Sequence, residues 1–126
     1  MLLVRTYLAP SSIDGLGLFA AEDIPKGTIT WEFYPEIDIV LEEFCLTKVQ
    51  FEFVTKYAFQ DKQLGKWILS ADDDRFTNHS DNPNTGPLPD GRMVALRDIK
   101  RGEEITSNYY HIDYDWTTKL VKPNEN

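Results

Sequence analysis

The segment that decides the fold of this chain is Arg75-Phe76-Thr77-Asn78-His79-Ser80-Asp81-Asn82-Pro83-Asn84. It is rich in side chains that hydrogen-bond to backbone and interrupt regular structure. Taken alone, Asn78-His79-Ser80 fits two interpretations equally: donors and acceptors that hold a polar cofactor, or a loop whose side chains cap its own backbone. A second segment, Gly102-Glu103-Glu104-Ile105-Thr106-Ser107-Asn108-Tyr109, places a phenol at the end of a strand-like stretch.

Other motifs are weaker when each is considered by itself. Gly15-Leu16-Gly17 could let backbone approach a ligand, but a glycine pair before an apolar run is more typical of a turn that enters a core strand. Residues 102–105 are most simply a surface turn before an edge strand, and Tyr109 and Tyr110 are most simply core or interface aromatics. Asp72-Asp73-Asp74 is typical of a solvated loop, although such a run could also attract a cationic substrate.

The composition excludes several classes of protein. A chain of 126 residues is long enough for one domain whose core needs neither disulfides nor structural metal. Its formal charge of −8 disfavours direct binding of nucleic acid, which needs clustered Lys and Arg, and favours basic partners. Cys45 is the only cysteine, so a Cys-based zinc site cannot be built within the chain. His79 and His111 alone fall short of a ligand set, and no metal is expected.

Hydrophobic patterning predicts a mostly-β domain with one inserted helical segment. Short strands rich in β-branched and aromatic residues are expected at residues 3–8, 28–33, 67–69, 93–96 and 104–106. Residues 42–59 are expected to be helical, because Leu46, Val49, Phe53 and Tyr57 recur at helical spacing and share one face.

The ends of the chain complete the expected organisation. Residues 1–121 are expected to form a single domain, and residues 122–126, which are polar and include a proline, are expected to fray. The first residues turn polar too early for a signal peptide, and no segment approaches the roughly 18 apolar residues of a membrane span. The chain is therefore predicted to be cytoplasmic, without membrane contact.

Together, in this order and at this spacing, the motifs resemble those of the SET-domain protein-lysine methyltransferases. That family has a Gly-x-Gly strand near its start, an Arg-Phe-x-Asn-His-Ser-x-x-Pro-Asn segment near its centre and a closing Gly-Glu-Glu-Leu-Thr-x-Asp-Tyr segment. The chain resembles the short, stand-alone members, because it lacks the cysteine-rich zinc cluster that follows the last motif in larger members.

The resemblance implies a fold and a set of site residues. The fold is a set of small curved sheets with a pseudoknot, which would place Asn78 beside Tyr109. The residues implied to bind S-adenosylmethionine are Gly15, Leu16, Gly17, Asn78 and His79. Tyr109 would be the catalytic residue, with its hydroxyl beside the methyl group in transfer and the lysine nitrogen.

The same resemblance implies a substrate channel lined by Phe33, Ser107, Tyr114 and Trp116. Phe33 replaces a tyrosine that the family often has after Glu32, so a hydroxyl is lost there. Ser107 stands where the family often has a Phe or Tyr that limits the number of methyl groups, so addition of more than one methyl group is expected. Tyr114 and Trp116 could close the channel as a lid, or could be ordinary packing residues of a C-terminal segment.

The implied reaction is methyl transfer from S-adenosylmethionine to a lysine side chain of a basic protein. The amine must be neutral, and holding a lysine with a pKa of about 10.4 neutral at pH 7 costs about 4 to 5 kcal/mol. A narrow apolar channel lowers that pKa by desolvation and by repulsion from the sulfonium, whereas a carboxylate inside the channel would oppose the change. The alternative function is a weakly active or inactive SET-fold module that binds a basic segment or the cofactor. Both functions are compatible with a monomer or a homodimer.

Overall fold

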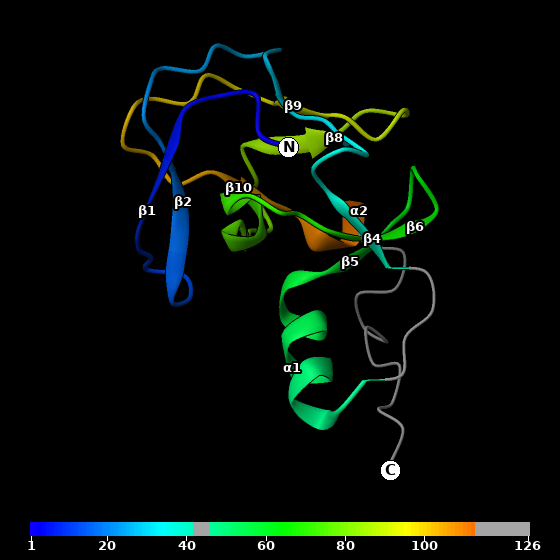
Figure 1. Cartoon of the computed structure of the whole chain (residues 1–126). Helices are drawn as coiled ribbons and strands as arrows, with labels where there is room; N and C mark the ends of the chain where they lie inside the picture. The colour runs from blue at the N-terminus through cyan, green and yellow to red at the C-terminus, as the bar shows by residue number, and fades with distance from the viewer. Residues whose placement is uncertain (42–45, 113–126) are drawn as a thin grey trace.

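The computed structural model describes residues 1–41 and 46–112 of the chain (Figure 1). Its strands are β1 (Thr6–Pro10), β2 (Leu16–Ala20), β3 (Ile29–Trp31), β4 (Ile39–Leu41), β5 (Phe59–Asp61), β6 (Lys66–Leu69), β7 (Asn78–His79), β8 (Thr85–Pro87), β9 (Met93–Ala95) and β10 (Thr106–Ser107). Its helices are α1 (Lys48–Tyr57), the short 3₁₀ helix η1 (Asp73–Phe76) and α2 (Tyr109–Ile112). The predicted mostly-β architecture with an inserted helical segment is confirmed.

The strands of the described residues form small sheets of two or three strands each. β1 and β2 form an antiparallel hairpin, β9 lies between β3 and β8, and β6 lies between β4 and β5. β7 and β10 pair in parallel although they are far apart in the sequence, with Thr106 opposite Asn78 and Ser107 opposite His79. This pairing joins the two segments that the sequence singles out.

A buried apolar cluster holds the residues before β10 against β2. It consists of Leu18, Ala20, Ile24, Ala95, Ile99 and Ile105, each at most 3% exposed. The Ile105 amide donates to the Leu18 carbonyl at 2.7 Å, and the Ala20 amide donates to the Glu103 carbonyl at 2.9 Å. Burial of each Leu or Ile side chain stabilises the folded state by about 1.5 to 3 kcal/mol. The core therefore anchors both β2 and the segment that ends at Tyr109.

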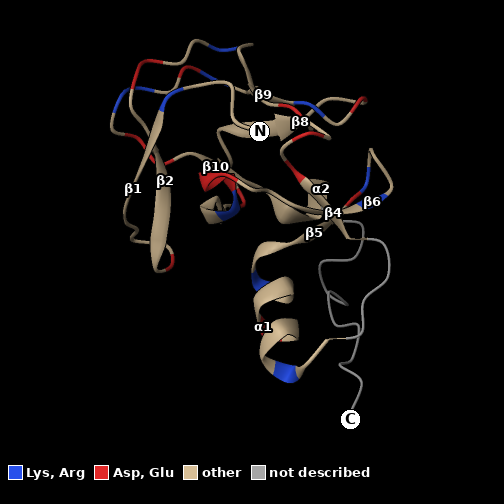
Figure 2. Cartoon of the chain, viewed as in Figure 1, with Lys and Arg blue, Asp and Glu red and all other residues tan. Residues whose placement is uncertain are grey.

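The predicted helix is present, but its apolar face is not buried. α1 begins at Lys48 behind a capping box in which the Thr47 side chain accepts from the Gln50 amide, and residues 42–45 lie outside the described residues. No residue of α1 is buried, and Val49 and Phe53 are 75% and 42% exposed. Figure 1 shows α1 projecting away from the sheets, and its ribbon in Figure 2 is mostly uncharged. Helical periodicity thus identified the element, but not a face packed on the core.

The acidic run is part of a helix rather than the solvated loop that was predicted. Asp72 caps η1, because its Oδ1 accepts from the Asp74 amide at 3.1 Å while its Oδ2 accepts from the Leu2 amide at 2.7 Å. Of the three aspartates only Asp73 is exposed. The prediction failed because short aspartate side chains satisfy free amides at a helix start as readily as they face water.

The expectations about the chain ends fall partly outside this description, since residues 113–126 are not described. The expected frayed tail lies in that segment. In the described part of the chain, none of the helices is sufficiently long and apolar to cross a membrane.

Candidate functional site

The two sequence segments meet at Tyr109. Ser80 donates its amide to the Ser107 carbonyl at 2.9 Å, which extends the contact between β7 and β10. The Tyr109 amide donates to Nδ1 of His79 at 3.0 Å, and the Tyr109 hydroxyl donates to the Thr77 carbonyl at 2.6 Å. Tyr109 therefore contacts both neighbours of Asn78, as the placement of Asn78 beside Tyr109 requires. Tyr110, which follows it, is 50% exposed.

The environment of Tyr109 keeps its phenol neutral. Burial raises the pKa of the Tyr109 hydroxyl to about 12, and the negative charges of Asp74, Asp14 and Glu104 act in the same direction. At neutral pH the group is therefore a hydrogen-bonding phenol rather than a phenolate. A neutral dipole can orient a reacting group without adding a full charge to the site.

Asn78 organises the backbone before β2. Its Nδ2 donates to the Asp14 carbonyl at 3.1 Å, to the Leu16 carbonyl at 3.3 Å and to Oε2 of Glu104 at 2.9 Å. Asn78 is 9% exposed, so these bonds are made in a largely buried position. One side chain of β7 thereby ties the glycine motif to the segment that precedes Tyr109.

Gly17 is needed where Glu104 approaches β2. A Cβ atom on Gly17 would lie 2.6 Å from Oε2 of Glu104, closer than side chains normally approach. The same carboxylate accepts from the Ser11 hydroxyl at 2.7 and 2.9 Å. Ser11, Gly17, Asn78 and Glu104 thus form one packed group, which we call the polar latch.

A large cavity of about 480 Å³ adjoins the polar latch. Its lining includes Gly15, Leu16, Asn78, His79 and Tyr109. Its size falls in the range of small-molecule sites, which is about 300 to 1,000 Å³. Four of the five predicted cofactor residues therefore line a single cavity. The fifth, Gly17, is not a lining residue, and its lack of a side chain makes room for Glu104.

The donor set of the large cavity suits S-adenosylmethionine. Lys56 and Arg75 bring cationic groups to its wall and Asp14 brings a carboxylate. These are the charges that complement the carboxylate and the ammonium of a methionine moiety. Leu16 is 46% exposed and Ile13 is 49% exposed, so the cavity also offers apolar surface. Backbone near Gly15, whose φ is 44°, adopts a conformation that favours glycine.

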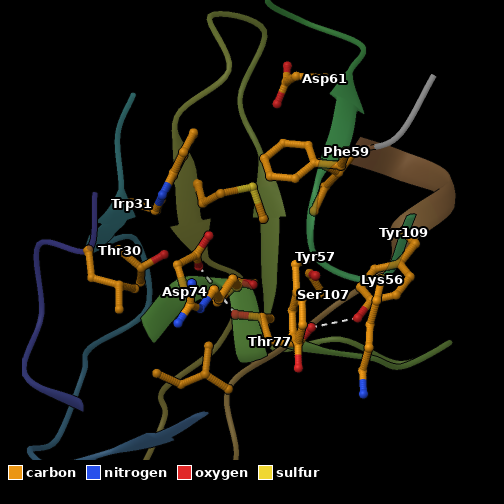
Figure 3. Close-up of a pocket in the computed structure, with 16 residues that line it drawn as sticks. Thr30, Trp31, Lys56, Tyr57, Phe59, Asp61, Asp74, Thr77, Ser107 and Tyr109 are labelled. Atoms are coloured by element: carbon orange, nitrogen blue, oxygen red, sulfur yellow. Dashed lines mark hydrogen bonds between the residues drawn. The ribbon is translucent and has the colours of Figure 1, made fainter. Parts of the chain in front are cut away.

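A small cavity of about 70 Å³ lies next to the large one. Its wall includes the rings of Trp31, Tyr57 and Phe59 together with Ser107 and Tyr109 (Figure 3). Ser107 is 4% exposed, so its small side chain forms part of an enclosed surface. The residues that line both cavities are Lys56, Tyr57, Arg75, Thr77 and Tyr109. The two cavities therefore share a wall that includes Tyr109.

Phe33, which the resemblance places in the substrate channel, is separate from both cavities. It lines neither cavity, and its ring lies under the Lys66 ammonium, 5.6 Å from Nζ to the ring centroid. β3 ends at Trp31, and the chain leaves the sheet before Phe33 can follow the strand's alternation into the cavity. Tyr114 and Trp116, the other predicted channel residues, lie outside the described residues.

Sequence reasoning missed several cavity residues, among them Tyr57 and Asp74. Tyr57 packs against Phe53 and Phe76, with ring centroids 5.0 and 5.6 Å away, and so brings the end of α1 to the site. Its place at the end of the predicted helical face was a signal that the helix approaches other elements. No group of three or more His, Cys, Asp or Glu side chains suited to a metal ion is found among residues 1–41 and 46–112.

Comparisons with known proteins agree with this geometry. The SET domain family model matches residues 15–110. "Histone-lysine N-methyltransferase trr" of Drosophila melanogaster is 31% identical over 124 residues, which cover 83% of this chain and 5% of that protein. "Histone-lysine N-methyltransferase, H3 lysine-36 specific" of Mycosarcoma maydis is 32% identical over 108 residues, covering 75% of this chain and 11% of that protein. The chain thus spans only a small part of these relatives.

Solved structures share the fold. A structure of ctPRC2 in an autoinhibited conformation, bound to S-adenosylmethionine, matches with a TM-score of 0.62 and 27% identity over 94% of this chain and 16% of that one. A humanized mutant of Chaetomium thermophilum Polycomb Repressive Complex 2 matches with a TM-score of 0.61 and 28% identity, covering 90% of this chain and 16% of that one. The predicted SET-domain fold class is confirmed.

Proposed function

The chain belongs to the SET-domain family, and we propose that it is a protein-lysine N-methyltransferase that uses S-adenosylmethionine. The observation that carries the proposal is the wall that the two cavities share, which includes Tyr109. Transfer of a methyl group to an amine requires alignment of the two reactants more than strong acid or base chemistry. Two cavities of unequal size that share one wall can bring a cofactor and a side chain together at that wall.

The large cavity is the proposed cofactor site. Gly15, Leu16 and His79 would contact the cofactor directly, and Asn78 would hold the loop before β2 in the receptive conformation. Gly17 would act by admitting Glu104 to the polar latch. S-adenosylmethionine, when bound, supplies the methyl group as part of a sulfonium. A relative of this fold is bound to S-adenosylmethionine, which supports the choice of cofactor.

The small cavity is the proposed lysine site. Its aromatic wall suits the slender methylene chain of lysine, and a cavity of about 70 Å³ limits entry to the tip of a side chain. The neutral Tyr109 hydroxyl would orient the amine. The enclosed, small Ser107 leaves room beside that amine for a methyl group already added. We therefore infer that more than one methyl group can be transferred, and product mass spectrometry that finds only monomethylation at long times would contradict this.

The proposed substrate is a basic protein. The curated relatives are named as histone-lysine methyltransferases, and the chain's formal charge of −8 favours approach of Lys-rich segments. Core histones are therefore a practical first substrate mixture.

Calorimetric titration with S-adenosylmethionine is the first test, because cofactor binding does not require the substrate to be known. Asn78→Ala removes the three donated bonds and should weaken cofactor binding by about 1 to 3 kcal/mol. Methyl transfer from labelled S-adenosylmethionine to core histones then tests catalysis. Saturable cofactor binding without transfer to any basic protein would favour the alternative function, an inactive binding module. The missing hydroxyl at Phe33 pointed toward that alternative, but Phe33 lines neither cavity, so this argument no longer counts against catalysis.

A further inference from the structure

Asp74 brings a carboxyl group into the wall of the small cavity. It lies at the start of η1, and in Figure 3 it is seen between Thr30 and Thr77. The Ser70 hydroxyl donates to Asp74 Oδ2 at 3.0 Å, and the Thr77 hydroxyl donates to Oδ1 at 3.2 Å. The Thr77 carbonyl accepts a hydrogen bond from the Tyr109 hydroxyl, so Thr77 connects Asp74 to Tyr109.

The carboxyl group of Asp74 forms no ion pair in the described part of the chain, and the positive charge of the Met1 amino group acts against the rise of its pKa. No Lys or Arg of residues 1–41 and 46–112 forms an ion pair with it. The charged groups nearest to it or in the same wall are Asp72, the Met1 amino group, Lys56, Asp61 and Arg75. An ionised carboxylate that is removed from water and held only by two hydroxyl groups is costly, so such positions are usually paired with a cation.

Burial accordingly raises the pKa of Asp74 to about 6, and repulsion from Asp72 acts in the same direction. A carboxyl group in this range exchanges its proton near neutral pH. General bases in enzymes are commonly tuned to this range by burial and neighbouring charge.

We propose that Asp74 receives the ammonium group of the incoming lysine and takes its proton before methyl transfer. The inference rests on the proposed methyltransferase function and adds a second catalytic residue to it. The geometry supports it because Asp74 and Tyr109 line the same small cavity and are connected through hydrogen bonds to Thr77. Figure 3 shows both side chains in that cavity.

The step is a single proton transfer. One N–H bond of the lysine ammonium breaks, its electron pair stays on nitrogen, and an O–H bond forms on the Asp74 carboxylate. The result is a neutral amine beside a neutral carboxylic acid. After the product leaves, the proton on Asp74 passes to solvent, which restores the carboxylate.

This step resolves the objection that a carboxylate in the channel opposes deprotonation of the lysine. An ionised Asp74 favours the ammonium only while both groups are charged. Desolvation in the cavity lowers the pKa of an amine and raises that of a carboxyl group, so the two values converge. When the pKa of the amine falls below that of the carboxyl group, the neutral pair replaces the ion pair, and the carboxylate that attracted the ammonium has lost its charge.

Asp74→Asn is the decisive variant, with Asp73→Asn as its matched control. Asp73 directly precedes Asp74 in the same short helix and is also an aspartate. It is exposed and lines neither cavity. Initial rates on core histones are measured between about pH 5 and pH 9, together with cofactor affinity and circular dichroism. We expect Asp74→Asn to lower the rate about 100-fold, the lower end of general-base contributions, with cofactor affinity and fold unchanged. Asp73→Asn should match the wild type.

The pH profile separates a proton acceptor from a structural role. The wild-type rate should fall about tenfold per pH unit below pH 6, and Asp74→Asn should lose this limb while keeping its low rate. The other ionisable side chains of the two cavities, among them Asp14, Asp61 and His79, are present in both proteins, so they do not produce the difference. A titration of the Asp74 carboxyl carbon by ¹³C nuclear magnetic resonance, without substrate, gives a readout independent of activity and should show a midpoint near 6.

The failures are distinguishable. Wild-type transfer with an unchanged rate and profile in Asp74→Asn would remove Asp74 from catalysis and leave the proposed function intact. Asp74 would be removed in the same way if its carboxyl carbon titrated at the ordinary aspartate value of about 3.9. A wild-type protein that binds S-adenosylmethionine but methylates no basic protein would overturn the proposed function and the role of Asp74 together.

Discussion

The two sides of Tyr109 are built from different kinds of contact. On the side of the large cavity, the polar latch closes a set of hydrogen bonds among Ser11, Asn78 and Glu104, with Gly17 packed beneath. On the side of the small cavity, the wall includes four aromatic side chains, and Asp74 forms no ion pair among the described residues.

The difference indicates a division of work. The latch satisfies its own polar groups, so the loop before β2 is already held in place before any ligand binds. In the small cavity Asp74 forms no ion pair with a Lys or Arg of the described residues, so its carboxylate can still attract an incoming cation. The large-cavity side is pre-organised to bind a ligand, and the charge of Asp74 on the small-cavity side favours a cationic side chain. Substitutions that change one side at a time should therefore separate binding from chemistry.

The largest effect is expected where the two sides meet. Tyr109→Phe removes the hydroxyl that would orient the amine and should lower methyl transfer at least about 100-fold, in the range of other oriented donors. Cofactor affinity should stay within about threefold, because the ring that lines the large cavity remains. Steady-state rates and calorimetry check the two sides separately. A variant with wild-type turnover would mean that another group positions the reactants.

Disruption of the latch should affect binding rather than chemistry. Gly17→Ala places a Cβ 2.6 Å from Oε2 of Glu104, so the carboxylate must move away from Asn78. We expect cofactor affinity to fall about 10-fold to 100-fold, since one or two hydrogen bonds to a charged group are lost. The control is Gly86→Ala in β8, where the added Cβ meets only the Leu96 side chain, at 3.2 Å. Equal cofactor affinities for the two alanine variants would show that the polar latch does not hold the loop before β2 in the conformation that binds the cofactor.

The carboxyl group of Asp74 should cost stability at neutral pH. Because the folded pKa of Asp74 is raised above the aspartate value, the folded state binds more protons between about pH 4 and pH 6 than the unfolded state does. The protonated Asp74 therefore stabilises the folded state fully below about pH 4. This stabilisation is lost as the pH rises to about 6. Asp74→Asn should be more stable than wild type at pH 7 by about 1 to 3 kcal/mol and equally stable near pH 4. Urea unfolding at the two pH values measures this. A destabilised variant at pH 7 would mean that the carboxylate is better compensated than its contacts indicate.

The latch side was largely predictable from sequence, and the other side was not. Two contiguous motifs contain the lining residues Asn78, His79, Gly15 and Leu16. Their residue types indicate hydrogen bonding in one motif and backbone freedom in the other. The resemblance implied only that Asn78 lies beside Tyr109, and the parallel pairing of β7 with β10 was not predicted, because a pairing across this many residues leaves no local pattern. The predicted strands rest on β-branched and aromatic residues, but the short strands β4, β5, β7 and β8 were missed because two or three residues carry too little alternation.

The small cavity is assembled from residues that have ordinary local explanations. Tyr57 continued a helical apolar stripe, Trp31 belonged to a strand, and Asp74 belonged to an acidic run. Their convergence depends on how α1, β3 and η1 are packed, which no spacing in the sequence encodes. Phe33 shows the converse error, since motif alignment placed it in the channel and the end of β3 at Trp31 directs it elsewhere.

The smallest effect is expected at Phe33, and it tests where the channel wall lies. Phe33→Ala removes a ring that packs under Lys66 and lines neither cavity, so methyl transfer should stay within about threefold of wild type. Tyr57→Ala removes an aromatic ring of similar size that lines both cavities, and it should lower the rate about tenfold or more through misplacement of the reactants. Comparison of initial rates on core histones, at cofactor concentrations that saturate each protein, gives the answer. If Phe33→Ala were the more damaging of the two, the family position after Glu32 would form the channel after all, and the aromatic wall would have to close around the lysine differently when substrate enters.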